Sequence, residues 1–198
     1  MYMPDGGMAE DFLHIAGLLQ VSVGNGTMRP FLLVGIENTE RRRDLTPPTS
    51  SEQDRKIATR VGGSAEFRDF LRKELIPEIA DRYPVTRERA IVGESLAGLF
   101  VVETWLLEPE LFDRYFAFDP SLWWDDGRLP REVAEKRDWH AQAGRALHIA
   151  NSSEPTIDPP VRQFVAAVRA SGIDGLQLNY KPMPAETHMS IYHPAALQ

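Results

Sequence analysis

The sequence predicts a three-layer α/β domain with a mostly parallel sheet. Short apolar runs alternate with longer amphipathic segments along the chain, and this alternation is typical of repeated strand–helix units. The length, 198 residues, is usual for one domain. Hydrophobic residues make up 42% of the chain and charged residues 26%, a balance that excludes disordered, collagen-like and coiled-coil proteins. We therefore expect a single domain over residues 1–198.

The expected elements follow one another in a regular order. The apolar run at 31–36 has the length of a buried strand, whereas the three arginines and paired prolines of 41–51 predict a loop. Apolar side chains recur at three- and four-residue spacing over 64–83, which predicts a helix with one apolar stripe. Further strands are expected at 90–92, 115–118, 147–150 and 176–180, and further helices at 96–107, 130–139 and 161–170.

Charge and residue types exclude several classes of function. Lys and Arg number 22 against 29 Asp and Glu, and the net charge of −7 disfavours nucleic-acid binding through phosphates. The chain has no cysteine, so disulfides, thiolate metal sites and cysteine nucleophiles are excluded. The histidines lack the helical His-x-x-x-His spacing of a metal site, and we expect no metal and no cofactor. No run approaches the roughly 18 apolar residues of a membrane helix. Because no signal peptide is visible either, we expect no membrane association and a cytoplasmic location.

The strongest local motif is Gly93-Glu94-Ser95-Leu96-Ala97-Gly98, which lies between an expected strand and an expected helix. A strand–turn–helix elbow holds a serine hydroxyl out over the sheet, and small residues two positions before and after the serine let the two backbones approach. The N–H group of Leu96, at the helix N-terminus, would face a developing oxyanion. The alternative is a tight turn in which Ser95 only caps the helix.

A second oxyanion donor is expected from an early loop. The segment Asp5-Gly6-Gly7 fits this role, because glycines let a backbone amide approach a substrate closely. We expect the amide of Gly7 to act together with that of Leu96.

A serine nucleophile also needs a histidine base and an acid that orients it. His188 and His193 both follow the last expected strand, where a base arrives when the chain order is serine, acid, histidine. We favour His188, in a loop, over His193, which resembles the start of a terminal helix. The acid is expected after the strand at 147–150, where Glu154 ranks above Asp158. The alternative for Glu154 is that it only opens a helix.

Five stretches, in matching order, resemble the esterase D-like branch of the α/β-hydrolases, which includes enterobactin-type siderophore esterases, feruloyl esterases, S-formylglutathione hydrolases and mycolyltransferases. They are residues 2–7, residues 34–38 with 43–47, residues 70–77, residues 93–100 and residues 119–124. The resemblance implies an α/β-hydrolase fold with Ser95 as nucleophile, Glu154 as acid, His188 as base, and the amides of Gly7 and Leu96 as oxyanion hole.

The same resemblance implies residues that contact substrate. Arg43 and Asp44 match the family's loop beside the active site, where they would shape the cleft, contact a polar substrate or form a structural ion pair. Trp123 and Trp124 would wall the substrate pocket or pack beneath a lid. By analogy these features favour a bulky polar small-molecule ester, such as a siderophore trilactone.

The chain departs from the family pattern at three places. Asp119 stands where the family commonly has serine, and we expect this change to matter little. By the family's count the strand at 1–3 would be the third of eight, and the terminal helix is reduced to 194–198. We therefore expect a chain that lacks the N-terminal strands and is truncated at both ends. The strand at 31–36 would then be an uncovered edge that pairs with a second copy, giving a homodimer, or leaves the chain marginally stable.

These observations predict a serine esterase that works through an acyl-enzyme. Ser95 attacks the ester carbonyl, His188 takes the serine proton, the amides of Leu96 and Gly7 hold the oxyanion, and water then releases the acid. Two alternatives remain open. One is an acyltransferase that uses the same serine with an acceptor alcohol, and the other is a catalytically inactive binding module.

Overall fold

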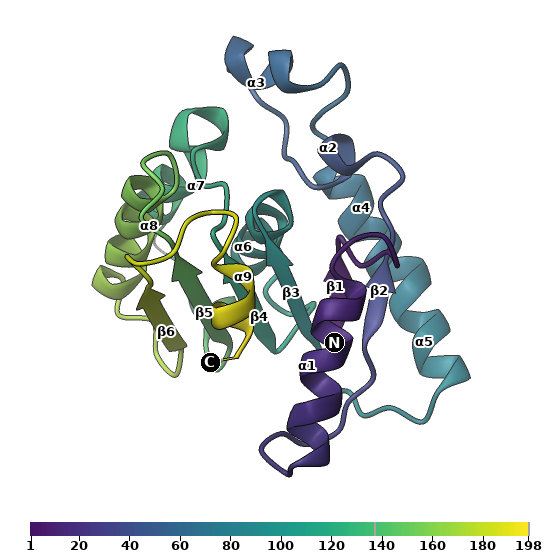
Figure 1. The fold of residues 1–198 in the computed structure, drawn as a ribbon. Coiled ribbons are helices and arrows are strands. Elements are labelled where there is room, and N and C mark those ends of the chain that lie inside the picture. The colour runs from purple at the N-terminus through teal and green to yellow at the C-terminus, as the bar shows by residue number, and fades with distance from the viewer. Residues whose placement is uncertain (137, 198) are drawn as a thin grey trace.

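A computed structural model describes residues 1–136 and 138–197, and the described residues form an α/β fold around one parallel sheet (Figure 1). The sheet has six strands in the order β2-β1-β3-β4-β5-β6, and every neighbouring pair is parallel. The strands are β1 (Tyr2–Pro4), β2 (Val34–Ile36), β3 (Ala90–Glu94), β4 (Arg114–Phe118), β5 (Ala146–Asn151) and β6 (Gln177–Pro182). The predicted fold class is confirmed. Since all strands run the same way, the loops after their carboxyl ends gather at one edge of the sheet.

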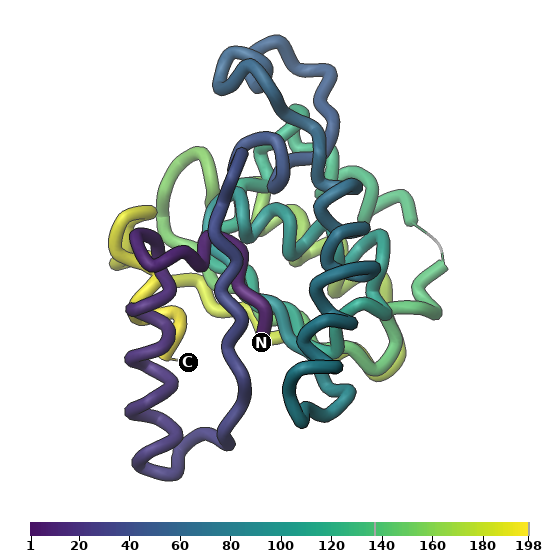
Figure 2. The backbone as a smooth tube through the Cα atoms, turned by 90° about the vertical axis from the view of Figure 1, so that its right-hand side faces the viewer, coloured from purple at the N-terminus to yellow at the C-terminus, as the bar shows by residue number. Residues whose placement is uncertain are grey.

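Helices cover both faces of the sheet. They are α1 (Phe12–Gly24), α2 (Arg41–Asp44), α3 (Glu52–Ile57), α4 (Ser64–Phe70), α5 (Ile76–Arg82), α6 (Leu96–Leu107), α7 (Trp124–Glu135), α8 (Asp158–Ala170) and α9 (Tyr192–Ala196). Helices α1 and α9 share an apolar cluster with one face, whereas α6, α8 and the α4–α5 segment pack on the other. Figure 2 shows α1 and the α4–α5 segment on opposite sides of the strands. In the described part of the chain, no helix is both long enough and apolar enough to cross a bilayer.

Alternation along the central strands builds the two apolar clusters. On β3, Ile91 belongs to the cluster on the α6 side and Val92 to the cluster on the α1 side, as the two-residue period of a strand requires. Helix α6 is buried at every position from Leu96 to Leu106, because most of its sequence is apolar. Its two polar side chains have partners inside the protein: Glu103 pairs with Arg68 at 2.6 Å, and Thr104 Oγ1 donates to the Phe100 carbonyl at 2.7 Å. A helix so completely enclosed holds the residue that precedes it, Ser95, in a fixed place.

Several boundaries differ from the sequence prediction. The helix expected over 64–83 is α4 and α5 joined by a π-helical turn at Leu71–Leu75. Pro77 has no N–H group to continue the normal ladder, which accounts for the irregular turn. The loop expected at 41–51 contains the short helix α2. Helix α9 begins before the expected 194–198, whose last residue lies outside the described residues.

The helix expected at 130–139 begins earlier and ends earlier. Helix α7 runs from Trp124 to Glu135, and residue 137 lies outside the described part of the chain. Asp125, Asp126 and Gly127 have φ angles of 52°, 53° and 74°, so α7 opens with three consecutive left-handed residues. Asp and Gly tolerate this conformation better than other residue types.

Strand β2 is the edge strand of the sheet, as expected, and is only three residues long. Beside it lies a largely apolar hollow of about 1250 Å³, bounded by α1, α5, α9 and residues of all six strands. Ser95 and His188 do not line this hollow. The homodimer through this edge stays a prediction.

Candidate active site

Ser95 occupies a strained elbow between β3 and α6. Its φ and ψ are 58° and −118°, values that an L-residue adopts only when the surrounding structure enforces them. A Cβ atom added to Gly93 would lie 2.6 Å from the Ala97 carbonyl carbon, so the closeness of strand and helix demands glycine there. The Ser95 N–H donates to the Phe118 carbonyl at 3.0 Å, and Ser121 N–H donates to the Ser95 carbonyl at 3.0 Å. The predicted elbow is present, and the Ser95 side chain makes no helix-cap hydrogen bond.

His188 lies beside the Ser95 hydroxyl. Its Nε2 is 3.1 Å from Ser95 Oγ, within hydrogen-bonding distance. The loop after β6 holds it there, because Met183 N–H donates to the Asn151 carbonyl at 2.7 Å and Ile191 N–H donates to the Thr187 carbonyl at 3.1 Å. The structure thus brings together the serine and the histidine that the sequence paired.

His193, the other candidate base, faces a different residue. Its Nδ1 lies 2.8 Å from His14 Nε2, and the two rings stack with centroids 5.0 Å apart. This pair joins α9 to α1. Within residues 1–136 and 138–197, no group of three or more histidine, aspartate and glutamate residues is arranged to hold a metal ion.

The carboxylate that meets His188 belongs to Asp119, immediately after β4. Asp119 Oδ2 lies 2.9 Å from His188 Nδ1, and the Asp119 side chain is fully buried. Ser152 donates twice to the same carboxylate, from its N–H to Oδ1 at 2.6 Å and from its Oγ to Oδ2 at 2.7 Å. Asp119 itself has a left-handed φ of 43°, and its N–H donates to the Ala150 carbonyl at 2.8 Å. Because Ser152 and His188 contact both of its oxygens, the Asp119 carboxylate is held in one orientation.

The expectation that Glu154 is the acid partner of His188 is therefore wrong. The Glu154 side chain makes no hydrogen bond or ion pair among the described residues, and its backbone carbonyl accepts the Ile157 and Asp158 N–H groups, both at 2.9 Å. Asp158, the second candidate, accepts from Arg162 Nε and from Asn151 Nδ2, each at 2.8 Å. The sheet order explains the error, since β4 lies between β3 and β5 and its carboxyl end is closer to the serine strand. An aspartate directly after an apolar strand was the signal available in the sequence.

Two titrating groups beside Ser95 have raised pKa values. The hydrogen bond that His188 Nδ1–H donates to Asp119 raises the pKa of His188 above its ordinary value, partly opposed by burial and helped by the charges of Asp119, Glu94 and Glu154. Burial raises the pKa of Glu94 to about 7, partly opposed by the positive charge of His188. Below its raised pKa, His188 carries a proton on both nitrogens and cannot accept another.

The two N–H groups expected to form the oxyanion hole differ in whether they already have a hydrogen-bond acceptor. Leu96 N–H, at the start of α6, has no acceptor in the described part of the chain. Gly7 N–H donates to Oε2 of Glu10 at 2.6 Å. The loop that carries Gly7 is anchored by Arg41, whose Nε and Nη2 donate to the two carboxylate oxygens of Asp5 at 2.8 and 2.7 Å.

Most of the residues expected to contact substrate make their polar contacts with other residues of the protein. Arg43 donates to the adjacent Asp44 carboxylate at 2.6 Å, so the structure contains the ion pair that was one of the two alternatives. Trp124 is 2% exposed, and its Nε1 donates to the Pro47 carbonyl at 3.0 Å. Such a buried residue packs beneath the loop above it and does not wall a pocket. Trp123 is only half-buried and stays a candidate.

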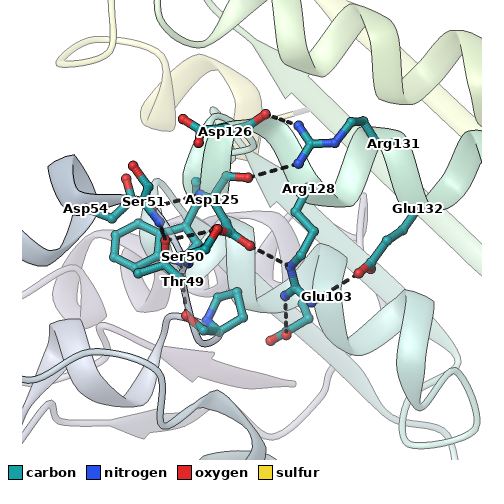
Figure 3. A network of polar contacts seen from close by, with 12 residues as sticks. Thr49, Ser50, Ser51, Asp54, Glu103, Asp125, Asp126, Arg128, Arg131 and Glu132 are labelled. Carbon is teal, nitrogen blue, oxygen red and sulfur yellow. Dashed lines mark hydrogen bonds and ion pairs between the residues drawn. The ribbon is translucent and has the colours of Figure 1, made fainter.

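The segment 46–62, which carries α3, projects from the body of the fold and is fastened at its base (Figures 1 and 2). Asp125 Oδ1 accepts from Ser50 N–H at 2.7 Å, from Ser50 Oγ at 2.9 Å and from Thr49 Oγ1 at 3.1 Å. Asp54 Oδ2 accepts in turn from the Asp125 N–H at 2.8 Å and from Thr49 Oγ1 at 2.7 Å (Figure 3). The left-handed turn at Asp125 aims its carboxylate at this segment. These contacts of Asp125 and Asp54 with Thr49 and Ser50 form a latch at the base of the segment, which no pattern in the sequence predicts.

The sequence is similar to one protein family and to several curated proteins. The sequence profile of the family described as Putative esterase matches residues 1–159. Ferri-bacillibactin esterase BesA of Bacillus subtilis is 34% identical over 111 residues, which are 53% of this chain and 36% of that protein. Apo-salmochelin esterase of Escherichia coli O6:H1 is 31% identical over 136 residues, 62% of this chain and 41% of the relative. The chain thus spans less than half the length of these two curated relatives.

Solved structures agree with the architecture. An IroE-like serine hydrolase from Shewanella oneidensis superposes with a TM-score of 0.82 and 29% identity, covering 98% of this chain and 66% of that one. Siderophore hydrolase EstA from Aspergillus nidulans has the same fold, with a TM-score of 0.81, 22% identity, and coverage of 99% of this chain and 78% of that one. Because the family profile covers well over half of its residues, the chain belongs to the Putative esterase family, and it has the α/β-hydrolase fold.

Proposed function

We propose that this chain is a serine carboxylic-ester hydrolase whose nucleophile, base and orienting acid are Ser95, His188 and Asp119. The observation that carries the proposal is the continuous chain of contacts from Asp119 Oδ2 to His188 Nδ1 (2.9 Å) and from His188 Nε2 to Ser95 Oγ (3.1 Å). A serine hydroxyl is a poor nucleophile until a base of this kind accepts its proton. The strained elbow contributes by holding Oγ in place before the substrate arrives.

The reaction then proceeds in two balanced halves. Ser95 Oγ bonds to the ester carbonyl carbon while its proton moves to His188 Nε2, and the carbonyl oxygen becomes an oxyanion held by Leu96 N–H and Gly7 N–H. His188 returns the proton to the leaving alcohol as the C–O bond breaks, which leaves an acyl-enzyme. Water repeats the sequence, with His188 again taking and returning a proton, and releases the carboxylic acid and free Ser95. Asp119 orients the imidazole and stabilises the imidazolium through its contact with His188 Nδ1.

For the substrate we propose a bulky polar ester of the siderophore type. The support is the names of the relatives, ferri-bacillibactin esterase and apo-salmochelin esterase, which align over parts of this chain. The half-buried Trp123 is the aromatic side chain that we expect to contact such a substrate.

A fluorophosphonate probe followed by p-nitrophenyl ester turnover tests the activity. Labelling of the wild-type chain, lost in Ser95→Ala and His188→Ala, is the expected result. His193→Ala is the matched control, because it removes a histidine from the same terminal region that contacts His14 instead of Ser95. Ester turnover with and without an added alcohol separates hydrolysis from acyl transfer. If a folded wild-type chain shows no labelling or turnover, and folded variants that retain Ser95, His188 and Asp119 show none either, the proposal is rejected and a binding module is favoured.

A further inference from the structure

One donor of the proposed oxyanion hole is occupied by a side chain of the same protein. Gly7 N–H donates to Glu10 Oε2 at 2.6 Å, and the other oxygen of that carboxylate, Oε1, accepts from Asn38 Nδ2 at 2.8 Å. Leu96 N–H, the partner donor, has no such acceptor among the described residues. In the proposed oxyanion hole, one N–H group therefore already donates a hydrogen bond and the other does not.

We propose that Glu10 is a brake on the esterase reaction, a carboxylate that the carbonyl oxygen of the substrate must displace from Gly7 before Ser95 can react. This inference rests on the proposed function. A backbone N–H is directional and forms one strong hydrogen bond, so an acceptor at 2.6 Å prevents a second oxygen from binding there at full strength. Hydrogen bonds to ionised acceptors are stronger than those to neutral carbonyls, so in the resting protein the carboxylate has the advantage.

The loop does not depend on Glu10 for its shape. Gly6 N–H donates to the Ile36 carbonyl at 3.0 Å, and Arg41 holds both carboxylate oxygens of Asp5. These contacts fix the loop to β2 and α2 from the other side. Removing the Glu10 side chain should therefore free the Gly7 amide and leave it in position.

The surroundings of Glu10 also allow it to leave. Its side chain is exposed, so the carboxylate can move into water without breaking packing. Asp5 and Asp11 lie close by, and the pKa of Asp11 is raised first by burial and then by the negative charges of Asp5 and Glu10. Because the Glu10 side chain is exposed and no ion pair among the described residues holds it, a neutral ester carbonyl can compete for the Gly7 amide.

The test compares Glu10→Ala, Glu10→Gln and the matched control Glu37→Ala. Glu37 is exposed, lies against Gly7 as Glu10 does, and makes no hydrogen bond in the described part of the chain. We expect Glu10→Ala to raise the rate constant for fluorophosphonate labelling, and kcat/KM for ester turnover, about tenfold. Glu10→Gln keeps an oxygen acceptor without the charge and should give a smaller rise, whereas Glu37→Ala should match the wild type.

The effect of added acetate on the reaction rate distinguishes a brake at the Gly7 amide from a purely structural role of Glu10. It should slow Glu10→Ala toward the wild-type rate by refilling the vacated amide, and leave the wild type unchanged.

The outcomes separate this inference from the proposed function. If the wild type reacts and Glu10→Ala reacts at the same rate or more slowly, with an unchanged Tm, the brake is refuted and the esterase assignment stands. If Glu10→Ala fails to fold, the reaction rate of Glu10→Gln relative to the wild type, at an unchanged Tm, decides between the same two outcomes. If neither the wild type nor a folded Glu10 variant reacts, both proposals fail. Reaction by the variant alone would show a brake strong enough to silence the wild type.

Discussion

Substituting Asp119 by asparagine removes one charge from the proposed triad and leaves its shape intact. The carboxylate is fully buried, and Oδ1 accepts from Ser152 N–H while Oδ2 faces both Ser152 Oγ and His188 Nδ1. In Asp119→Asn the amide oxygen stays toward the Ser152 N–H, which needs an acceptor, and the NH2 group then faces His188 Nδ1. An N–H donor in that place requires Nδ1 to be unprotonated, so the imidazole proton moves to Nε2 and points at Ser95.

The expected loss of activity follows from that reversal. A hydrogen bond to a charged group contributes about 1.5–3 kcal/mol, which alone corresponds to a loss of roughly ten- to hundredfold. The wrong tautomer adds to this, because Nε2 can no longer accept the Ser95 proton. We expect kcat/KM for a p-nitrophenyl ester to fall by about 10³- to 10⁴-fold, the magnitude that this substitution has in serine triads.

The pH profile gives a second readout of the same change. The hydrogen bond that His188 donates to Asp119 is the largest cause of the raised pKa of His188. The wild type therefore loses activity as the pH falls through that raised value. Without the carboxylate, His188 stays neutral to lower pH, and the acid limb of the residual kcat/KM profile should move to lower pH.

The matched control is Glu154→Gln, which removes the acid first expected from the sequence. Glu154 acts on His188 only through its charge, so we expect kcat/KM to stay within about threefold of the wild type. A large loss in Glu154→Gln with near-normal activity in Asp119→Asn would refute the triad described here.

Three other predictions concern the framework of the site. Arg68→Met should lower the free energy of unfolding, measured in urea, by about 3–5 kcal/mol, because the buried Glu103 loses its 2.6 Å ion pair. Adding Glu103→Leu should restore much of that stability, and an equal loss in the double variant would contradict the prediction. Asp125→Ala should speed limited proteolysis within 46–62, since that segment loses three hydrogen bonds to Asp125, and an unchanged cleavage rate would show that the latch does not hold it. If β2 pairs with a second copy, the sedimentation coefficient should rise with concentration; a monomer at every concentration with an ordinary Tm would exclude the edge interface.

The elbow could be predicted because its requirements are local. Gly93, Ser95 and Ala97 lie within five residues, and the apolar runs on both sides identify the strand and the helix that meet there. His188 could be chosen for a related reason, since a parallel sheet carries every loop that follows a strand to the same edge. The alternation of apolar runs likewise predicted the fold class.

The local conformations at other positions were not visible in the pattern. The latch depends on a left-handed φ at Asp125, and an Asp-Asp-Gly run is compatible with many turns. The occupation of Gly7 by Glu10 depends on where one rotatable side chain comes to rest. Hydrophobic periodicity carries no information about either.

What the sequence by itself determined is the α/β architecture, the serine elbow and the histidine that lies beside it. Only the tertiary structure decided which carboxylate orients that histidine. Asp119 and Glu154 both follow strands that end at the same edge, and chain order cannot rank them. Sheet order can, because β4 lies directly beside the serine strand, and the left-handed turn at Asp119 brings its buried carboxylate against His188 Nδ1.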